Sequence, residues 1–287
     1  MRILLTGSKG QLGQTVRRRL PEDWELIAAD SQTLNITDGE AVSNMAENFQ
    51  PDVIINTAAC TGLEKAHERT DKIFAVNAEG ARNLAQAAAK VGAKLIHLST
   101  DYVFNGQSRQ PYAETAAPDP QCVYARSKLS GELLALAAHT DTLIIRTSSI
   151  YSEYGRNFVK TLLQQARGQQ EIRLADDNAS CPTYAGDLAD AVTGLLRLPH
   201  FPRGILHYCG RQAFSQYGFG MAVLKAEAER DPSFAIPSVI PVTQAELDKN
   251  GKRPIYSVLD CSRARGLGFA PGDWQKTIVR LLAQINP

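Results

Sequence analysis

The sequence has few of the features that would place the protein outside the ordinary globular class. Its 287 residues contain no long apolar run of the kind found in membrane spans or signal segments, so we expect a cytoplasmic protein that does not use a membrane. Basic and acidic residues nearly balance, at 31 against 30, which gives no reason to expect nucleic acid as a partner. The length fits a nucleotide-binding domain with a smaller lobe.

Cysteine is scarce and is not arranged for bridging or for metal binding. The five cysteines are odd in number and widely spaced, and they form no C-x-x-C pair. No histidine lies near any of them at zinc-site spacing. We therefore expect free thiols and no metal at the following positions: Cys60, Cys122, Cys181, Cys209 and Cys261.

Short apolar runs alternate with longer stretches rich in Ala, Leu, Lys, Arg and Glu. This alternation is typical of parallel strands covered by helices on both faces. It predicts an α/β fold with a Rossmann-type, doubly wound parallel sheet. The runs that we expect to form its first strands are residues 3–6, 26–29, 53–56, 95–99 and 143–147.

After residue 151 the rhythm loosens and indicates a smaller, interleaved C-terminal substrate-binding lobe. We expect residues 1–151 with about 182–209 to form the dinucleotide-binding domain, and about 152–181 with 210–287 to form the lobe. Prolines between positions 232 and 271 favour loops and short elements there. The later elements expected are helices at 124–138, 157–167 and 188–197, and strands at 172–174 and 205–209.

A glycine-rich turn connects the first strand to the following helix. Gly7, Gly10 and Gly13 allow the backbone to approach a pyrophosphate at the positive end of the helix dipole. Asp30 ends the second strand, where a carboxylate binds ribose hydroxyls and favours NADH. Lys9 within the turn would favour the 2′-phosphate of NADPH, so the sequence does not decide between NADH and NADPH.

Polar residues follow the fourth strand at the edge where open parallel sheets bind ligands. Thr100 and Asp101 stand at that edge. Downstream, the i, i+4 spacing of Tyr124 and Lys128 places both on one helix face. A phenolate is stabilised by a neighbouring ammonium and an oxidised nicotinamide, which makes Tyr124 a candidate general acid.

Several longer segments extend these motifs. They include LLTGSKGQLG, GAKLIHLSTDYVFNG, VYARSKLSGE and RPIYSVLD. With these segments the chain resembles, over nearly its whole length, the dTDP-4-dehydrorhamnose reductase family of the extended short-chain dehydrogenase/reductase superfamily. The resemblance implies NAD(P)H-dependent reduction of the 4-keto group of a nucleotide-linked deoxysugar, dTDP-4-dehydro-L-rhamnose, to dTDP-L-rhamnose.

The resemblance also implies roles for individual residues. Tyr124 would protonate the nascent alkoxide, Lys128 would lower the pKa of Tyr124 and hold the nicotinamide ribose, and Thr100 would orient the sugar carbonyl. Asp101 and Ser149 would contact the sugar. Besides Tyr124 and Lys128, the implied cofactor-binding residues are Gly7, Gly10, Gln11, Leu12, Gly13, Asp30, Asn35, Ile36, Ala59, Cys60 and Thr61.

Several positions depart from the family pattern, among them Asn178 and Ser180, which replace a glutamine and a glycine of a loop. Asn35 replaces an aspartate, although its amide oxygen accepts the same hydrogen bond. Ser149 replaces an aromatic residue that would pack on the sugar, which puts the identity of the sugar in doubt. Thr15 replaces a glutamate that binds magnesium in dimeric members, so we expect no structural magnesium and a monomer or weak homodimer.

Two other functions fit the sequence. One is a reductase or epimerase of another nucleotide sugar. The other is a cofactor-binding regulatory subunit without turnover, against which the presence of Thr100, Tyr124 and Lys128 argues. Outside these motifs, we interpret His97 as a packed, hydrogen-bonded histidine. Asn77 would either cap a helix and pack there, which we favour, or place a catalytic water.

Overall fold

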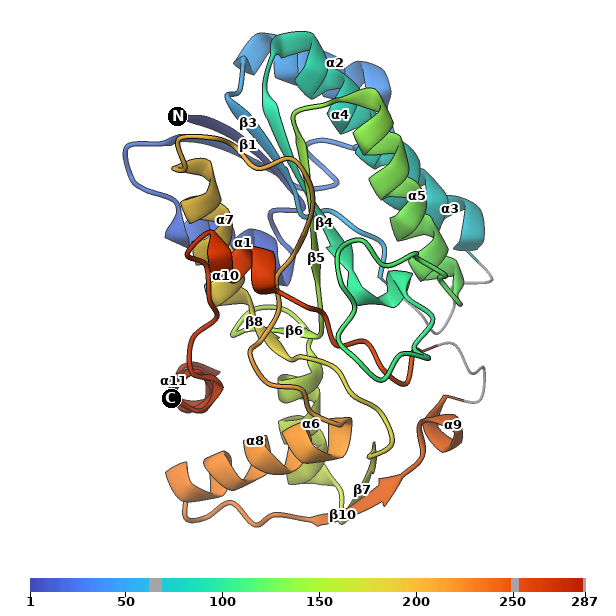
Figure 1. Cartoon of the computed structure of the whole chain (residues 1–287). Coiled ribbons are helices and arrows are strands. Elements are labelled where there is room, and N and C mark those ends of the chain that lie inside the picture. The colour runs from blue at the N-terminus through green and yellow to red at the C-terminus, as the bar shows by residue number, and fades with distance from the viewer. Residues whose placement is uncertain (62–68, 249–252, 286–287) are drawn as a thin grey trace.

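The fold is taken from a computed structural model, which describes residues 1–61, 69–248 and 253–285. Within these ranges six parallel strands form the central sheet, in the order β2-β1-β3-β4-β5-β9 (Figure 1). Each strand lies within two residues of its predicted range, so the doubly wound α/β prediction is confirmed. The strands are β1 (Arg2–Thr6), β2 (Glu25–Ala29), β3 (Val53–Asn56), β4 (Lys94–Thr100), β5 (Thr142–Thr147) and β9 (Gly204–His207).

Helices cover both faces of this sheet because alternate strand residues point to opposite sides. One face carries Leu5 and Ile55 and packs on α1 (Gln11–Arg19), α7 (Ala185–Leu196) and α10 (Ser262–Gly266). The opposite face carries Leu4 and Ile54. It packs on α2 (Gly39–Phe49), α4 (Gly80–Val91) and α5 (Val123–Ala138).

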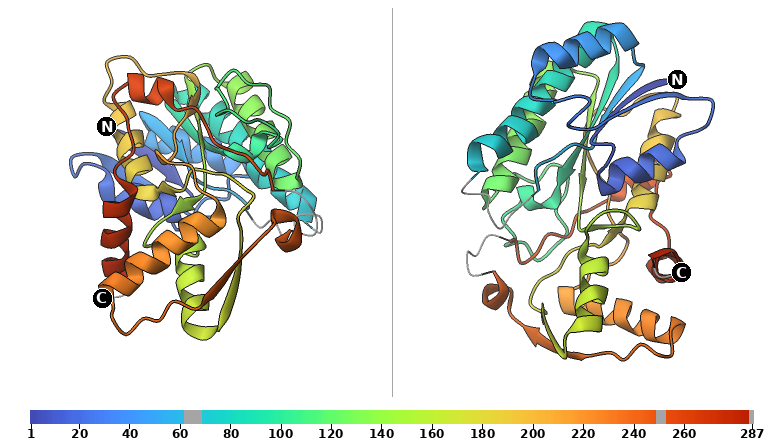
Figure 2. Two further views of the ribbon diagram at one scale, coloured as in Figure 1. Left: turned by 60° about the horizontal axis from the view of Figure 1, so that its bottom comes forward. Right: turned by 180° about the vertical axis from the view of Figure 1, so that it is seen from behind.

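A smaller lobe lies beyond the carboxyl edge of the sheet (Figures 1 and 2). Its core joins aromatic and aliphatic residues such as Tyr151, Leu162 and Phe219. Two short parallel pairs contribute to the lobe, one formed by β6 with β8 and the other by β7 with β10. The elements are β6 (Ile150–Tyr151), α6 (Phe158–Gly168), β7 (Glu171–Ala175), β8 (Thr183–Tyr184), α8 (Gln216–Arg230), β10 (Ser238–Val242), α9 (Gln244–Leu247) and α11 (Trp274–Ile285).

The C-terminal part differs from the sequence-based prediction in two ways. Helices α8 and α11 are long elements on either side of the proline-rich stretch, and neither was predicted. In addition, α10 packs with Leu267 and Phe269 against the core of the sheet domain, although this stretch falls in the range predicted for the lobe. Where the structure describes the stretch between the prolines, its elements are short, as predicted. The exact residue boundary between domain and lobe stays a prediction.

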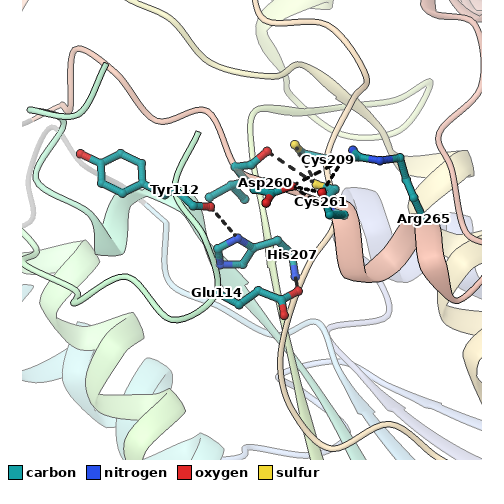
Figure 3. Close-up of polar contacts among 9 residues, drawn as sticks. Tyr112, Glu114, His207, Cys209, Asp260, Cys261 and Arg265 are labelled. Carbon is teal, nitrogen blue, oxygen red and sulfur yellow. Dashed lines mark hydrogen bonds and ion pairs between the residues drawn. The ribbon is translucent and has the colours of Figure 1, made fainter. Parts of the chain in front are cut away.

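A cluster of polar and sulfur-containing side chains joins the end of β9 to the returning C-terminal segment (Figure 3). The Glu114 carboxylate accepts a hydrogen bond from the backbone N–H of His207 at 2.8 Å, and the ring Nδ1 of His207 lies 3.1 Å from the Tyr112 carbonyl oxygen. The thiols of Cys209 and Cys261 are buried, and their sulfur atoms lie 3.4 Å apart. All five cysteines are free thiols, and His207 is packed and hydrogen-bonded.

A buried ion pair fixes α5 to the sheet. Arg146 on β5 donates hydrogen bonds to Glu132 on α5, the shortest at 2.6 Å from Nη2, and both side chains are almost fully buried. Ser99 on β4 donates a further hydrogen bond to the same carboxylate. The guanidinium also lies over the ring of Phe104, 5.2 Å from its centre. Glu132 therefore connects one helix with two strands.

We expect Glu132→Gln to lower the free energy of unfolding by about 3–5 kcal/mol, because the neutral amide leaves the buried Arg146 charge uncompensated. The measurement is urea unfolding followed by circular dichroism. Glu47→Gln is the matched control, since Glu47 pairs with Lys90 on an exposed surface, and its loss should cost at most about 1 kcal/mol. Equal losses in the two variants would contradict this account of Glu132.

Candidate active site

The glycine turn lies at the switch point of the sheet. The chain continues from β1 to β2 on one side and from β3 to β4 on the other, so the segments that follow β1 and β3 leave a crevice between them. Gly7 has φ +73°, and a Cβ atom there would lie 2.5 Å from the backbone nitrogen of Ala58. A Cβ atom at Gly13 would lie 2.2 Å from the Gly7 carbonyl oxygen. Only glycine fits these two positions.

Helix α1 begins directly after this turn. Its N-cap, Gly10, provides no side-chain hydrogen bond, so the first turn keeps backbone N–H groups that a helix normally has to satisfy. Such an N-terminus suits an anionic ligand. Gln11 links the turn to the loop that begins the smaller lobe, because its side-chain oxygen accepts a hydrogen bond from Ser152 at 3.1 Å. The crevice, the glycines and the open helix end fit the pyrophosphate of a dinucleotide.

Asp30, at the end of β2, is paired with Lys9 from the glycine turn. The Lys9 ammonium holds the pKa of Asp30 well below its usual range, and the backbone N–H groups of Thr33 and Gln32 act in the same direction. Asp30, predicted to favour NADH, and Lys9, predicted to favour NADPH, thus lie in contact.

Asn35 and Ile36 follow in the same region and differ in exposure. The Asn35 side chain is exposed, and its oxygen accepts hydrogen bonds from the backbone N–H and the hydroxyl of Thr37, at 3.2 and 3.0 Å. Ile36 is buried in the core beside α4, where a Cβ atom at Gly80 would lie 2.7 Å from it. The Asn35 oxygen is therefore already used within its own turn.

Asn77 fixes the segment that contains Ala59, Cys60 and Thr61. Its amide accepts from the Cys60 N–H at 2.8 Å and donates to the Cys60 carbonyl at 3.0 Å. A third hydrogen bond, 2.9 Å long, joins the amide to Ser127 on α5. Asn77 lies in a short π-helix, η2 (Ala75–Glu79), after α3 (Thr70–Phe74), a type of element frequent at functional sites. Asn77 is buried, as the packing role predicts, but it caps no helix, so the capping part of that prediction was wrong.

The structure brings Thr100, Tyr124 and Lys128 together between β4 and α5. The hydroxyls of Thr100 and Tyr124 are hydrogen-bonded to each other. The Lys128 side chain is 2% exposed, and its Nζ donates to the Leu98 carbonyl at 2.5 Å and lies 3.3 Å from the His97 Nε2 atom. These residues occupy the carboxyl edge predicted for the chemistry.

The proton affinities of the two site residues shift in opposite directions. Burial raises the pKa of the Tyr124 phenol, the hydrogen bond from Thr100 opposes that effect, and the Asp101 charge adds to it. Burial lowers the pKa of Lys128 to about 8. The expected lowering of the Tyr124 pKa is therefore not a property of the protein alone, in which the Lys128 amine is directed to Leu98 and His97.

A cleft of about 810 Å³ lies between the sheet domain and the lobe. Of the residues predicted for the site, Cys60, Thr61 and Ser149 line it. Tyr124 does not, but Tyr102 does, and its ring meets that of Tyr124 edge-on at 6.3 Å. Ser149 has φ +43°, and its hydroxyl donates to that of Ser180 at 3.2 Å.

Sequence reasoning missed the charge of this cleft. Three arginines line it, and its described lining contains no aspartate or glutamate. They are Arg69, Arg156 and Arg253. Arg156 precedes the helix predicted at 157–167 and Arg253 begins the segment RPIYSVLD, but spacing alone does not reveal that these segments converge with that of Arg69. A positively charged cleft beside a dinucleotide crevice suits an anionic substrate such as a nucleotide diphosphate.

Neither a metal centre nor a membrane element is apparent in the described residues. No three of their His, Cys, Asp and Glu side chains gather as a set of metal ligands would. Among the helices within the same ranges, none is both long enough and apolar enough to cross a membrane.

Asp101 is buried at the edge of the site. Ser148 donates to its carboxylate at 2.6 Å and Thr100 at 3.1 Å, and Ser257 gives a further hydrogen bond. Burial outweighs these contacts and raises the pKa of Asp101 from 3.8 to about 6. A carboxyl whose pKa is higher in the folded state stabilises the fold below its unfolded pKa and loses that contribution as the pH rises through the folded value.

We therefore expect wild type to lose stability between pH 4 and pH 7 relative to Asp101→Asn, which cannot ionise. The difference in unfolding free energy between the two proteins should change by up to about 3 kcal/mol over this window, in favour of the variant at the higher pH. Urea unfolding at several pH values measures it. Stability curves that stay parallel from pH 4 to pH 7 would show that Asp101 titrates normally.

Comparison with known proteins agrees with this geometry. The family model described as RmlD substrate binding domain matches residues 1–286. The chain is 36% identical over 284 residues to the spore coat polysaccharide biosynthesis protein SpsK of Bacillus subtilis, covering 99% of this chain and 97% of that protein. It is 34% identical to dTDP-4-dehydrorhamnose reductase of Aggregatibacter actinomycetemcomitans, with 98% of each covered. A crystal structure of dTDP-4-dehydrorhamnose reductase from Bacillus anthracis in complex with NADP superposes with a TM-score of 0.92 at 32% identity, covering 99% of both chains. The chain belongs to the RmlD substrate binding domain family.

Proposed function

We propose that the protein is an NAD(P)H-dependent oxidoreductase that reduces the 4-keto group of dTDP-4-dehydro-L-rhamnose to give dTDP-L-rhamnose. The observation that carries this proposal is the convergence of Thr100, Tyr124 and Lys128 at the carboxyl edge of the sheet, beside a crevice that only glycine residues allow. The relatives named dTDP-4-dehydrorhamnose reductase support the substrate, and the structure in complex with NADP supports the cofactor.

Tyr124, Thr100 and Lys128 have separate roles in the proposed reaction. The reduced nicotinamide supplies the hydride when it is bound. Tyr124 gives its phenolic proton to the oxygen at C4 as that oxygen gains negative charge, and Thr100, hydrogen-bonded to Tyr124, orients the same oxygen. Lys128 holds the nicotinamide ribose and favours the phenolate through its charge. Near neutral pH a raised phenol pKa keeps Tyr124 protonated and ready to act as the acid.

The cleft supplies recognition of the nucleotide sugar. Its three arginines bind the diphosphate, since guanidinium groups match phosphate oxygens in charge and geometry. Ser149 and Ser180 present hydroxyl groups toward the sugar, and Asp101 supports this wall through Ser148. The glycine turn and Gln11 bind the pyrophosphate of the cofactor, while Asp30 and Lys9 lie at its adenosine ribose.

The proposed function includes a division of the chain into two parts, a cellular location and an oligomeric state. We place the dinucleotide-binding domain at residues 1–151 with about 182–209, together with α10, and the substrate-binding lobe in the rest of the chain. The protein acts in the cytoplasm as a monomer or weak homodimer. Gel filtration with light scattering tests the oligomeric state.

The direct test is oxidation of NADPH and NADH, followed at 340 nm, with enzymatically prepared dTDP-4-dehydro-L-rhamnose, and identification of the product by mass spectrometry and NMR. We expect dTDP-L-rhamnose. Turnover of another nucleotide-linked 4-keto-sugar, but not of this one, would keep the chemistry and overturn the substrate. Cofactor binding without turnover of any such sugar would indicate a regulatory subunit.

In the same assay Tyr124→Phe should lower kcat by about a hundredfold or more, because the ring stays in place while the acidic proton is lost. Its dissociation constant for the cofactor, measured by fluorescence quenching, should match that of wild type. Tyr102→Phe is the matched control, since Tyr102 lies in edge-on contact with Tyr124 but has no proposed proton to give. Wild-type turnover by Tyr124→Phe would reject Tyr124 as the acid.

Cofactor choice should depend on the pair of Lys9 and Asp30. Asp30→Ala removes a carboxylate that repels the 2′-phosphate of NADPH, and we expect the NADPH/NADH ratio of kcat/KM to rise by about tenfold. Lys9→Ala should lower the same ratio, because it removes the attracting charge and leaves the carboxylate. If both variants keep the wild-type ratio, neither residue contacts the ribose end of the cofactor.

A further inference from the structure

Asn56, the last residue of β3, has a fixed side-chain orientation. It is 1% exposed, and its Oδ1 atom accepts hydrogen bonds from the Thr6 hydroxyl at 2.8 Å and from the Ala58 backbone N–H at 3.0 Å. A backbone N–H only donates, so the oxygen of the amide must face Ala58. The NH₂ group of Asn56 therefore points the other way, to the Nδ1 atom of His97 at 2.8 Å.

This orientation determines the tautomer of His97. The pKa of His97 lies well below its ordinary value, because the ring is buried and the Lys128 charge opposes a second positive charge, so the ring is neutral. The NH₂ group of Asn56 donates, which requires a lone pair on Nδ1. The single ring proton of His97 is then on Nε2.

The Nε2–H group of His97 faces the side-chain nitrogen of Lys128 at 3.3 Å. The neutral amine of Lys128 has a lone pair and accepts a hydrogen bond from this N–H group. The ammonium form has no lone pair, so two hydrogen-bond donors would face each other and repel. The Leu98 carbonyl, 2.5 Å from Nζ, serves either form of the lysine. We propose that His97 is a positioning residue which, held by Asn56 with its proton on Nε2, stabilises the neutral amine of Lys128 in addition to the effect of burial.

The other charged groups around Lys128 do not explain the same effect. Glu132, one turn further along α5, favours the ammonium, but the buried Arg146 from β5 already neutralises it. Asp101 from η3 (Asp101–Val103) acts on the Tyr124 phenol. On the side of α3 and η2, the uncharged amide of Asn77 meets α5, whereas Asp71 and Lys72 are exposed and Glu79 pairs with Arg82. A Lys128 pKa of about 8, lowered by burial, agrees with an environment that favours the amine.

The inference rests on the proposed function, because it assigns a task to the lysine of that site. A lysine with the proton affinity of an exposed side chain would keep its proton through the whole reaction. With its amine stabilised by the His97 N–H, Lys128 gives up its proton more easily than such a lysine would. His97 thus acts on the site from inside the sheet, without contact with substrate.

The tautomer is measured directly by long-range ¹H–¹⁵N correlation NMR on protein labelled with ¹⁵N-histidine. Five histidines give signals, and loss of one set in His97→Gln assigns it. We expect a bonded proton on Nε2 and none on Nδ1. The ¹⁵N chemical shift of His97 Nε2 should change in one step near pH 8, where the neighbouring Lys128 amine takes up or releases its proton. This step should be absent in Lys128→Met.

A second variant exchanges the tautomer. In Asn56→Asp one carboxylate oxygen keeps the contacts to Thr6 and Ala58, and the other accepts a hydrogen bond from the Nδ1–H group, so the Nε2 lone pair would face Lys128. In this variant we expect the ring proton of His97 on Nδ1. The step in the His97 Nε2 chemical shift should lie at least about one pH unit higher than in wild type. Asn77→Asp is the control for added charge, since it places a carboxylate against α5 without touching His97, and there the ring proton should stay on Nε2.

A ring proton on Nδ1 in wild type would overturn the proposal. So would a step that stays in place in Asn56→Asp while the tautomer changes. If Asn56→Asp does not fold, the wild-type tautomer and the absence of the pH step in Lys128→Met still decide, because neither measurement needs that variant. The NMR arms need no turnover, so failure of the proposed function and failure of this inference give different results.

Discussion

Helix α5 buries two charged side chains against the central sheet, and the position of the site depends on how these charges are satisfied. Lys128 and Glu132 lie one turn apart on the same face of the helix. Glu132 is bound by Arg146 and Ser99, and Lys128 is bound by the Leu98 carbonyl. Buried charges are costly unless they are paired, so sliding the helix along the sheet would break several contacts at once. With the helix held in this register, the phenol of Tyr124 meets the hydroxyl of Thr100.

The parts of this arrangement that follow from local pattern could be predicted from the sequence. The strands are short and apolar on both faces, so they stand out, and β3 agrees with its predicted range residue by residue. The glycine turn is recognisable because it follows a strand and precedes a helix. Tyr124 and Lys128 are recognisable because helical spacing alone puts them on one face. In these cases a few neighbouring residues hold all the information.

Contacts between distant segments could not be predicted in the same way. The pairing of Glu132 with Arg146 is not visible in the sequence, because it forms only when the fold brings α5 onto β5. Asn77 was expected to cap a helix or place a water, whereas its partners are the backbone of Cys60 and the hydroxyl of Ser127. Helix α8 escaped notice because glycines interrupt its first turns, yet a Cβ atom at Gly220 would lie 2.5 Å from Leu174 of the strand beneath it. The glycine that weakens the helical pattern is the one that lets the helix pack.

The joint between the sheet and the lobe links the chemistry to the choice of substrate. Ser148, just after β5, is buried and donates to Asp101, whereas Ser149 adopts a left-handed conformation and is exposed at the cleft. The Ser149 carbonyl accepts a hydrogen bond from the Thr183 backbone N–H at 3.1 Å, which fixes this turn from the side of the lobe. A non-glycine residue in such a conformation costs about 1–3 kcal/mol and persists only where its surroundings hold it. Because Asp101 holds one side of the turn and the lobe holds the other, the cleft wall at Ser149 depends on both parts of the chain, and under the proposed function a change of residue at 149 alters the wall that the sugar meets.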